Sequence, residues 1–362
     1  MSGILIKGNW NKMISEEKET KIDKLIGRLK GTAAEQPEKA AGTAEKAELS
    51  LRGTVRAVCI SERKGTEKHP VAEGKLCGHY GIEGDAHAGN WHRQVSLLSY
   101  DKVEAFNARG GAAKDGDFGE NILATGIDFR ALPVGTKLRC GEVLLRMTQI
   151  GKECHSHCAI YQRVGDCIMP REGVFAEVLH GGSIRPGDVI TAELPGADEP
   201  LSAAVIVMSD KGAKGERVDE SGPEAARILR EAGYEVVEQF VIPDEPAEIR
   251  KQLIRLSDQR QVSLIVTSGG TGMAPRDQTP EATLAVCDRN VPGIAEAIRA
   301  GSMQYTKRAM LSRGVSAMRK KTLIVNLPGS PKAVAESLEL ILPSLRHGLL
   351  LVRGSDGECA RQ

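Results

Sequence analysis

The chain has 362 residues, with 49 Lys and Arg against 48 Asp and Glu, and only 3% aromatic residues. This length predicts two domains with room for sizeable cores. The balanced charge and the scarcity of aromatic rings argue against a dedicated nucleic-acid binder, and no apolar run approaches the roughly 18 residues of a membrane-spanning helix.

Residues 1–50 form an N-terminal extension. The first residues, MSGILIKGNWNKM, lack the pattern of a signal peptide, so we expect a cytoplasmic protein whose eight cysteines are mostly reduced. Residues 31–50 are rich in Ala, Glu and Lys with Gly and Pro interruptions. They fit a flexible linker, a frayed helix or an ordered spacer, and the sequence does not choose among them.

Residues 51–194 contain many short β-like runs separated by Gly-containing turns, with one helix near 101–109. This pattern is typical of a sandwich or barrel. The predicted strands are Thr54–Ile60, Gln94–Ser99, Lys137–Arg139, Glu142–Met147, Val174–Leu179 and Asp188–Ala192.

Residues 195–201 read as a linker, and residues 202–353 alternate strands with helices before a C-terminal tail at 354–362. This alternation predicts an α/β domain with a doubly wound parallel sheet. Ser221 and Glu224 have the spacing of a capping box, with Ser221 as the N-cap. Predicted strands cover 203–208, 235–242, 262–267 and 322–326, and predicted helices cover 221–232, 246–256, a segment from 279 and 333–342.

Polar or glycine-rich segments follow all four predicted strands of this second domain. They are Ser209-Asp210, Pro243-Asp244-Glu245, Ser268–Gly272 with Arg276, Asp277 and Glu281, and Leu327–Lys332. Ligands of such sheets bind beyond the carboxyl ends of the strands, so four segments at one edge predict a pocket.

The residue types at this edge suit a phosphate-containing ligand. A glycine loop lets backbone N–H groups approach phosphate oxygens, although Gly269-Gly-Thr-Gly272 is not a Walker A motif. Asp244 and Asp277 could share Mg²⁺ with phosphates, and Lys332 could neutralise their charge. Each segment alone could equally be a tight turn or a helix cap, and it is their convergence that favours a ligand site.

This set of motifs resembles the molybdopterin adenylyltransferase family over about residues 202–353. Ala309–Arg313 and Leu342–His347 add to the likeness. The resemblance implies transfer of AMP from Mg-ATP to molybdopterin with release of pyrophosphate, and a homotrimer formed by this domain. It implies catalytic roles for Asp244 and Asp277, with Asp277 placing Mg²⁺. The residues expected to bind nucleotide and pterin phosphate are Ser209, Asp210, Ser268, Gly269, Gly270, Thr271, Gly272, Arg276, Glu281, Pro328, Gly329, Ser330 and Lys332.

Three cysteines cluster in the first domain: Cys154, Cys158 and Cys167, with His155 and His157 among them. A structural zinc site would need a second pair of ligands with short spacing, and no such pair follows Cys154 and Cys158 in the sequence. Buried reduced thiols are one alternative, which also suits Cys59 and Cys140. A reactive thiolate at Cys154, favoured by Lys152 and the histidines, is the other.

Upstream, His87 and His92 belong to Gly84–Gln94, which we interpret as a structured loop rather than a metal site. Asp117–Asn121 could line the same pocket or form a turn. With the Cys154 segment, these pieces resemble the MOSC domain over about residues 52–194. The resemblance implies a mostly-β barrel and a cysteine that carries sulfur or ligates molybdenum. Cys154 is the best positional match, and Cys158 and Cys167 compete with it.

Together the two resemblances predict a bifunctional multidomain protein of molybdenum cofactor biosynthesis. The second domain would adenylylate molybdopterin, and the MOSC domain would bind the molybdenum or tungsten cofactor or modify its sulfur ligand. Implied partners are molybdopterin synthase, a cofactor-insertion enzyme and target molybdoenzymes. The alternative is a non-catalytic molybdopterin carrier fused to a MOSC enzyme that acts on N-hydroxylated compounds.

Overall fold

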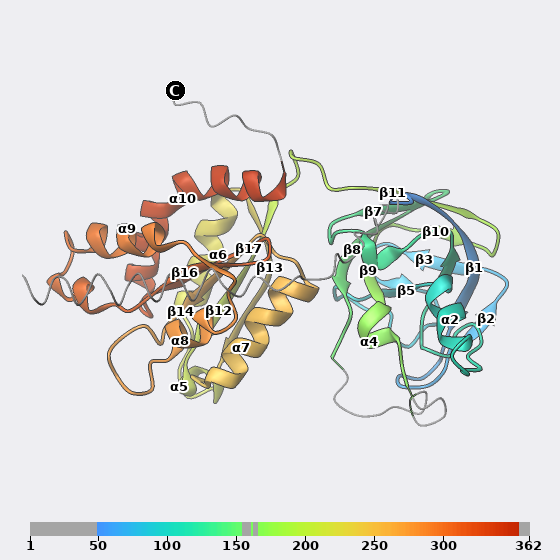
Figure 1. Cartoon of the computed structure of the whole chain (residues 1–362), viewed down its shortest axis with the longest axis horizontal. Coiled ribbons are helices and arrows are strands. Elements are labelled where there is room, and N and C mark those ends of the chain that lie inside the picture. Colours follow the sequence, from blue (N-terminus) through green and yellow to red (C-terminus); the bar gives the residue numbers. More distant parts are fainter. Residues whose placement is uncertain (1–48, 154–160, 162–165, 355–362) are drawn as a thin grey trace, which may run out of the picture. The chain divides into compact units, whose positions relative to one another are not determined.

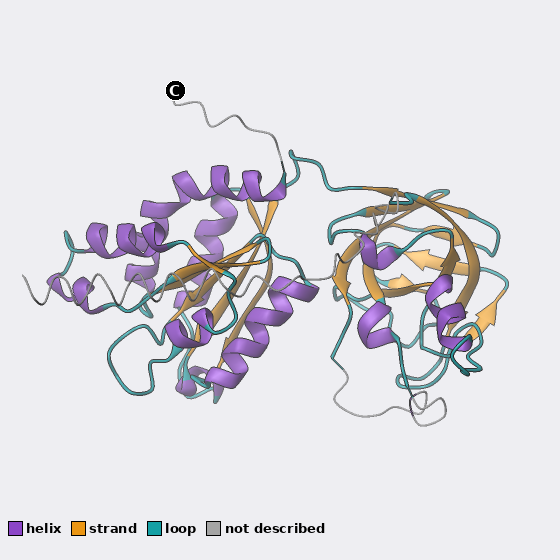
Figure 2. Cartoon of the chain, viewed as in Figure 1, coloured by secondary structure: helices purple, strands orange, loops and turns teal. Residues whose placement is uncertain are grey.

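The computed structural model describes residues 49–153, 161 and 166–354 (Figure 1). The expectations for residues 1–48, for Cys154 and Cys158, and for most of the C-terminal tail lie outside this range. Within it, a β-barrel precedes an α/β domain, as Figure 2 shows by its colouring of strands and helices. The predicted multidomain fold class is confirmed.

Seven strands close the barrel, in the order β11-β7-β8-β9-β5-β6-β1, with β1 pairing back to β11 and with β2 added at β1. Only β5 and β6 pair in parallel. From Arg52 to Ala57 alternate residues of β1 are buried, which is the period of two expected where one strand face meets a core, and the next two residues are buried on both faces. The strands are β1 (Arg52–Ile60), β2 (His69–Val71), β5 (Val95–Ser99), β6 (Ile122–Thr125), β7 (Lys137–Cys140), β8 (Val143–Ile150), β9 (Val174–His180) and β11 (Val189–Glu193).

Smaller elements surround the barrel. A second sheet has the order β10-β3-β4. Phe106 of helix α2 packs against Phe118, 5.1 Å between ring centroids, in an apolar cluster on the outer face of the barrel. The remaining elements are β3 (Gly74–Cys77), β4 (Gly81–Ile82), β10 (Gly182–Ile184), α2 (Tyr100–Asn107), α4 (Met169–Glu172) and the 3₁₀ turn η1 (Phe129–Ala131).

The α/β domain is built on a six-stranded sheet, in the order β13-β12-β14-β17-β16-β15. The first four strands are parallel, as predicted, whereas β15 and β16 run antiparallel at one edge. The strands are β12 (Leu201–Met208), β13 (Tyr234–Ile242), β14 (Leu264–Ser268), β15 (Arg289–Asn290), β16 (Ser316–Arg319) and β17 (Thr322–Leu327).

Helices cover both faces of this sheet. On one face α6, α9 and α10 bury Leu229, Ile298 and Leu338, and on the other α7 and α8 bury Leu253 and Ala282. Such two-sided cover explains why β14 and β17 are buried at every position. The helical elements are α5 (Asp210–Ala213), α6 (Ser221–Glu231), α7 (Pro246–Ile254), the π-helical turn η2 (Arg255–Gln259), α8 (Thr279–Leu284), α9 (Pro292–Ser302), the 3₁₀ turn η3 (Lys307–Leu311) and α10 (Pro331–Arg353).

The start of α6 corrects one prediction. Asp219, not Ser221, supplies the capping carboxylate, because its Oδ1 accepts hydrogen bonds of 3.0 Å from the N–H groups of Ser221 and Gly222. Ser221 lies inside the first turn, and its hydroxyl donates to the same oxygen. An Asp and a Ser two residues apart give the same local pattern, so the sequence alone did not separate them.

Candidate functional site

The four parallel strands of the α/β domain end together. Met208 pairs with Ile242, and Ser268 pairs with Leu327. The predicted convergence of four loops at this edge is therefore confirmed, while the role of each residue in binding or catalysis stays a prediction. The loops also bond to one another, since the N–H of Gly269 donates to the carbonyl of Leu327 at 3.3 Å.

Asp210 and Asp244 bind each other reciprocally across two of these loops. The N–H of Asp210 donates to Asp244 Oδ2 at 3.1 Å, and the N–H of Asp244 donates to Asp210 Oδ1 at 3.0 Å. Arg276 then joins Asp210 to Glu245, with N···O distances of 3.0 Å and 2.6 Å. Three of the four loops are thus tied together by charged side chains.

The glycine loop passes between the two predicted catalytic carboxylates. A methyl group added at Gly270 would lie 3.3 Å from Asp244 Oδ1, and one added at Gly272 would lie 2.7 Å from Asp277 Oδ2. Gly270 also has a φ of +64°, a conformation that favours glycine, and its missing side chain leaves space for the Thr279 hydroxyl. A side chain at either position would displace a carboxylate or this hydroxyl.

The electrostatic surroundings of the two paired aspartates differ. Burial raises the pKa of Asp244, and the Asp210 and Asp277 carboxylates raise it further, against the hydrogen bond from the Asp210 N–H. The Arg276 guanidinium instead holds the pKa of Asp210 below its ordinary value. The negative charge of Asp210 is thus balanced by Arg276, while Asp244 lies between the carboxylates of Asp210 and Asp277, which favour its protonated form.

A cavity of about 170 Å³ opens beside this cluster. Its lining includes Ser209, Ser221, Ser268 and Gly329. The Ser268 hydroxyl donates to the carbonyl of Pro328 at 3.0 Å, which fixes two loops against each other.

Two other predicted residues at this edge have structural partners. Ser330 is the N-cap of α10, its hydroxyl accepting from the N–H of Ala333. Lys332 is not part of the cavity lining. Its side chain is 85% exposed, and its ammonium lies 3.8 Å from the Glu336 carboxylate.

Two residues of this edge were not predicted as site residues. Thr279 is fully buried, and its hydroxyl has no hydrogen-bond partner among the described residues. Arg313, quoted above only as part of a motif, donates to the carbonyls of Gly272 and Asp277 and pairs with Glu281. A single sequence gives no signal for such partners, because they are set by tertiary packing.

The barrel holds a buried ion pair between Lys68 and Asp85, whose side chains are 1% and 0% exposed. Asp85 also accepts from the N–H groups of Ser61 and His87, at 3.0 Å and 2.9 Å. Lys68 Nζ lies 3.3 Å from His87 Nδ1, so the pair fixes both the backbone and the ring of His87. This arrangement satisfies the buried charges, as burial of an ion pair requires.

His87 faces a barrel cavity of about 240 Å³. The cavity is also lined by Trp91, Arg93, Ser96, Gly119, Asn121, Lys152, Glu153, Met169 and Phe175. Part of the Asp117–Asn121 segment thus lines the pocket, while Glu120 is buried and accepts from the N–H groups of Gly116 and Phe118. Lys152 and Glu153 directly precede Cys154 in the chain.

Cys59, Cys140 and Cys167 fit the interpretation of buried reduced thiols, whereas Cys77 and Cys287 are partly exposed. Cys167 is 8% exposed and belongs to an apolar cluster. Burial raises the pKa of Cys59 to about 12 and that of Cys140 to about 11, which keeps both thiols protonated. Cys154 and Cys158, the other two candidates, lie outside the described residues.

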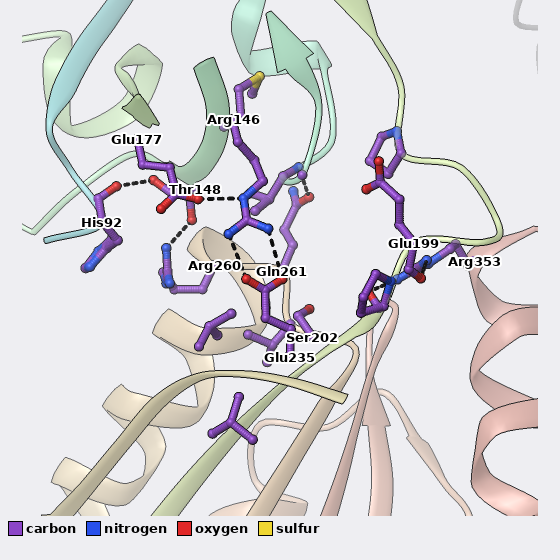
Figure 3. A pocket seen from close by; sticks show the side chains of 18 residues that line it. His92, Arg146, Thr148, Glu177, Glu199, Ser202, Glu235, Arg260, Gln261 and Arg353 are labelled. Carbon is purple, nitrogen blue, oxygen red and sulfur yellow. Dashed lines mark hydrogen bonds and ion pairs between the residues drawn. The ribbon is translucent and has the colours of Figure 1, made fainter. Parts of the chain in front are cut away.

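His92 lines a different cavity from His87, and Figure 3 shows this pocket from close by. Burial and the Arg260 guanidinium lower the pKa of His92 to about 4, so its ring stays neutral. The charged side chains here already pair with protein groups, Arg146 with Glu177 and Glu235 among them. We assign no ligand to this pocket. No group of three or more His, Cys, Asp or Glu within residues 49–153, 161 and 166–354 is arranged to hold a metal.

Comparison with known proteins agrees with both resemblances. Residues 204–347 match the family described as "Probable molybdopterin binding domain", and residues 84–191 match the MOSC domain. The chain is 39% identical over 159 residues to a molybdopterin adenylyltransferase of Helicobacter pylori, covering 43% of this chain and 90% of the relative. The chain belongs to the molybdopterin adenylyltransferase family.

Two further proteins have similar sequence identity to this chain. The molybdopterin adenylyltransferase of Escherichia coli is 42% identical over 142 residues, or 38% of this chain and 72% of the relative. The solved structure of the molybdopterin biosynthesis enzyme MoaB of Thermus thermophilus is 47% identical and covers 43% of this chain and 98% of its own, with a TM-score of 0.41. The predicted fusion of a MOSC domain with a domain of this family is confirmed.

Among the described residues, the helices are all too short or too polar to cross a bilayer.

Proposed function

We propose that residues 202–353 transfer AMP from Mg-ATP to the terminal phosphate of molybdopterin. The observation that carries this proposal is the glycine loop, which runs between Asp244 and Asp277 at the edge where four parallel strands end. Similarity to curated adenylyltransferases over most of their length supports the same conclusion.

In the proposed reaction, a phosphate oxygen of molybdopterin attacks the α-phosphorus of ATP. A new P–O bond forms, the bond to the β-phosphate bridge breaks, and pyrophosphate leaves. The nucleophile is already an anion at neutral pH, so the protein needs no strong general base. Positioning and charge stabilisation are therefore the contributions expected from this chain.

The residues present fit a magnesium ion shared with phosphates. Mg²⁺ is usually held by one or two carboxylates together with substrate phosphates and water, rather than by an all-protein cage. Asp277 and Asp244 would supply carboxylate oxygens, and the ion would neutralise charge on the phosphates. The backbone N–H groups of Gly269–Gly272 would approach the phosphates from the space between the two carboxylates. The cavity lined by Ser209, Ser268 and Gly329 would receive the second substrate.

The test is an adenylylation assay on the full chain. With metal-free molybdopterin and Mg-ATP, we expect AMP-molybdopterin on chromatography. Asp277→Asn and Asp244→Asn should each lose about 10²-fold or more in rate, since each removes a charge from the reacting centre. Binding of molybdopterin without any product would favour the carrier alternative instead.

We further propose that the MOSC domain binds the molybdenum or tungsten cofactor or modifies its sulfur ligand, with Cys154 as the functional thiol. The barrel cavity supports this: its lining includes His87, Lys152 and Glu153, and the last two directly precede Cys154 in the chain. A soft thiolate suits a metal–sulfur centre. Partners that make or receive the cofactor, such as molybdopterin synthase, an insertion enzyme and molybdoenzymes, belong to the same proposal.

Metal content tests the MOSC proposal. The purified chain should carry molybdenum or tungsten, and Cys154→Ser should lower that content strongly. Cys167→Ser, which alters a thiol in an apolar cluster, is the matched control and should retain it. Equal metal content in all three proteins would reject Cys154, and loss with Cys158→Ser alone would move the role to that residue.

A homotrimer formed by the α/β domain is also proposed. Exposed apolar side chains on η3 and on the segment between α9 and η3 support an interface here. They are Met303, Tyr305, Met310 and Leu311.

A further inference from the structure

Arg313 lies between η3 and β16 and makes an unusual set of contacts for a half-exposed arginine. Its Nε donates to the carbonyl of Gly272 at 2.7 Å, and its Nη2 donates to the carbonyl of Asp277. Its Nη1 pairs with the Glu281 carboxylate. Its own N–H donates to the carbonyl of Thr271 at 2.9 Å. All four bonds go to one stretch of chain, from the glycine loop to the first turn of α8.

Within this stretch Arg276 also pairs with Asp210 and Glu245, but the turn that carries Asp277 lies mostly at the surface. Met273 is 70% exposed, and the residues from Met273 to Arg276 are all exposed. Within this stretch, Asp277 Oδ2 accepts a hydrogen bond of 3.0 Å from the N–H of Ala274, so the carboxylate stabilises the turn formed by residues 274–277. Arg313 donates a hydrogen bond to the backbone carbonyl at each end of this turn, Gly272 at its start and Asp277 at its end.

The planar guanidinium explains why an arginine suits this place. It presents five N–H donors in a fixed fork, so three acceptors that it contacts are held at fixed distances from one another. Two of these acceptors are backbone carbonyls, which a point charge such as a lysine ammonium cannot bind in the same way. The hydrogen bond from Arg313 to the Asp277 carbonyl fixes the position of the Asp277 backbone, and with it the starting point of the Asp277 side chain.

We propose that Arg313 is a positioning residue for adenylyl transfer: it holds the Asp277 carboxylate in place through the loop backbone and does not contact substrate. The inference rests on the proposed function for its kinetic consequences only. Because a misplacement of about 1 Å at a reacting centre costs about 10²-fold in rate, Arg313→Gln should lower kcat by about that factor. The KM for ATP should change much less.

A double-mutant cycle distinguishes positioning from direct substrate contact. If Arg313 acts through Asp277, then Arg313→Gln should cost little once Asp277 is already Asn, because both changes remove the same contribution. Arg313→Lys should recover only part of the rate. Arg308→Gln alters an exposed arginine of η3 and is the matched control, with wild-type kinetics expected. Additive losses, or a rise in KM with kcat unchanged, would overturn the proposal in favour of a phosphate contact.

Hydrogen–deuterium exchange gives a readout that does not depend on activity. In Arg313→Gln the amides from Thr271 to Asp277, including the Ala274 N–H, should exchange at least about 10-fold faster than in wild type or Arg308→Gln, because the loop loses three of its anchoring bonds. Unchanged exchange would reject the positioning role. If the wild-type chain makes no AMP-molybdopterin, the proposed function fails, and this exchange experiment still decides whether Arg313 holds the loop.

Discussion

At the scale of single residues, buried ionisable groups distinguish the barrel. Lys68 and Asp85 neutralise each other there, whereas the fully buried Glu120 is bonded, among the described residues, to backbone N–H groups. Burial therefore raises the pKa of Glu120 from an ordinary 4.5 to about 7, although the N–H groups of Gly116 and Phe118 oppose the shift. Between pH 4.5 and about 7, the Glu120 carboxyl is therefore protonated in the native barrel and ionised in the unfolded chain.

The sign of the resulting pH dependence follows from linkage. Between pH 4.5 and about 7 the native state binds more protons at Glu120 than the unfolded state does. The stability that Glu120 contributes is thus complete below 4.5 and is lost as the pH rises through about 7. Glu120→Gln removes this dependence. Denaturant unfolding at several pH values should show wild type losing stability relative to the variant as pH rises, and parallel profiles would contradict the account.

At the scale of elements, the glycine loop depends on a close approach between backbone and side chain. A methyl group at Gly270 would lie 2.2 Å from the Thr279 hydroxyl, and the φ of +64° already disfavours alanine. Gly270→Ala should therefore destabilise the domain by about 1–3 kcal/mol and reduce adenylylation at least about tenfold.

Gly293 in α9 offers a matched control, because nothing lies within 4 Å of the position that its methyl group would take. Gly293→Ala should leave activity unchanged and stability equal or higher by up to about 1 kcal/mol, as expected for an alanine in a helix. Equal effects of the two substitutions on denaturant unfolding would show that the close approach at Gly270 is unimportant.

The elements also show what a sequence can predict. The four parallel strands, α6 and α7 lie close to the predicted ranges, because their apolar runs and Gly or Pro boundaries are local signals. Helix α9 was not predicted, and α10 runs to Arg353, past the predicted end at 342. The two-to-four-residue strands β3, β4 and β10 have no such signal. Partners such as Lys68 for Asp85, or Arg313 for Asp277, lie 17 and 36 residues apart. Only the folded arrangement brings them together.

At the scale of the whole molecule, the proposed trimer predicts a mass three times that of one chain in light scattering. Met310 is 61% exposed on η3, so Met310→Glu should shift the protein toward the monomer by placing a charge in the interface. Val189→Glu changes an exposed residue of the barrel and should leave the trimer intact. A monomeric wild-type chain, or equal masses for all three proteins, would contradict the proposal.

The most direct test of the central claim follows the α-phosphate of ATP and measures the pyrophosphate that is released. With Mg-ATP labelled at the α-phosphate, the proposed reaction places the label in AMP-molybdopterin and releases unlabelled pyrophosphate in equal amount, and Asp277→Asn slows both by about 10²-fold or more. Release of ADP with transfer of the terminal phosphate, or label that stays in ATP while molybdopterin binds, would contradict adenylyl transfer by this domain.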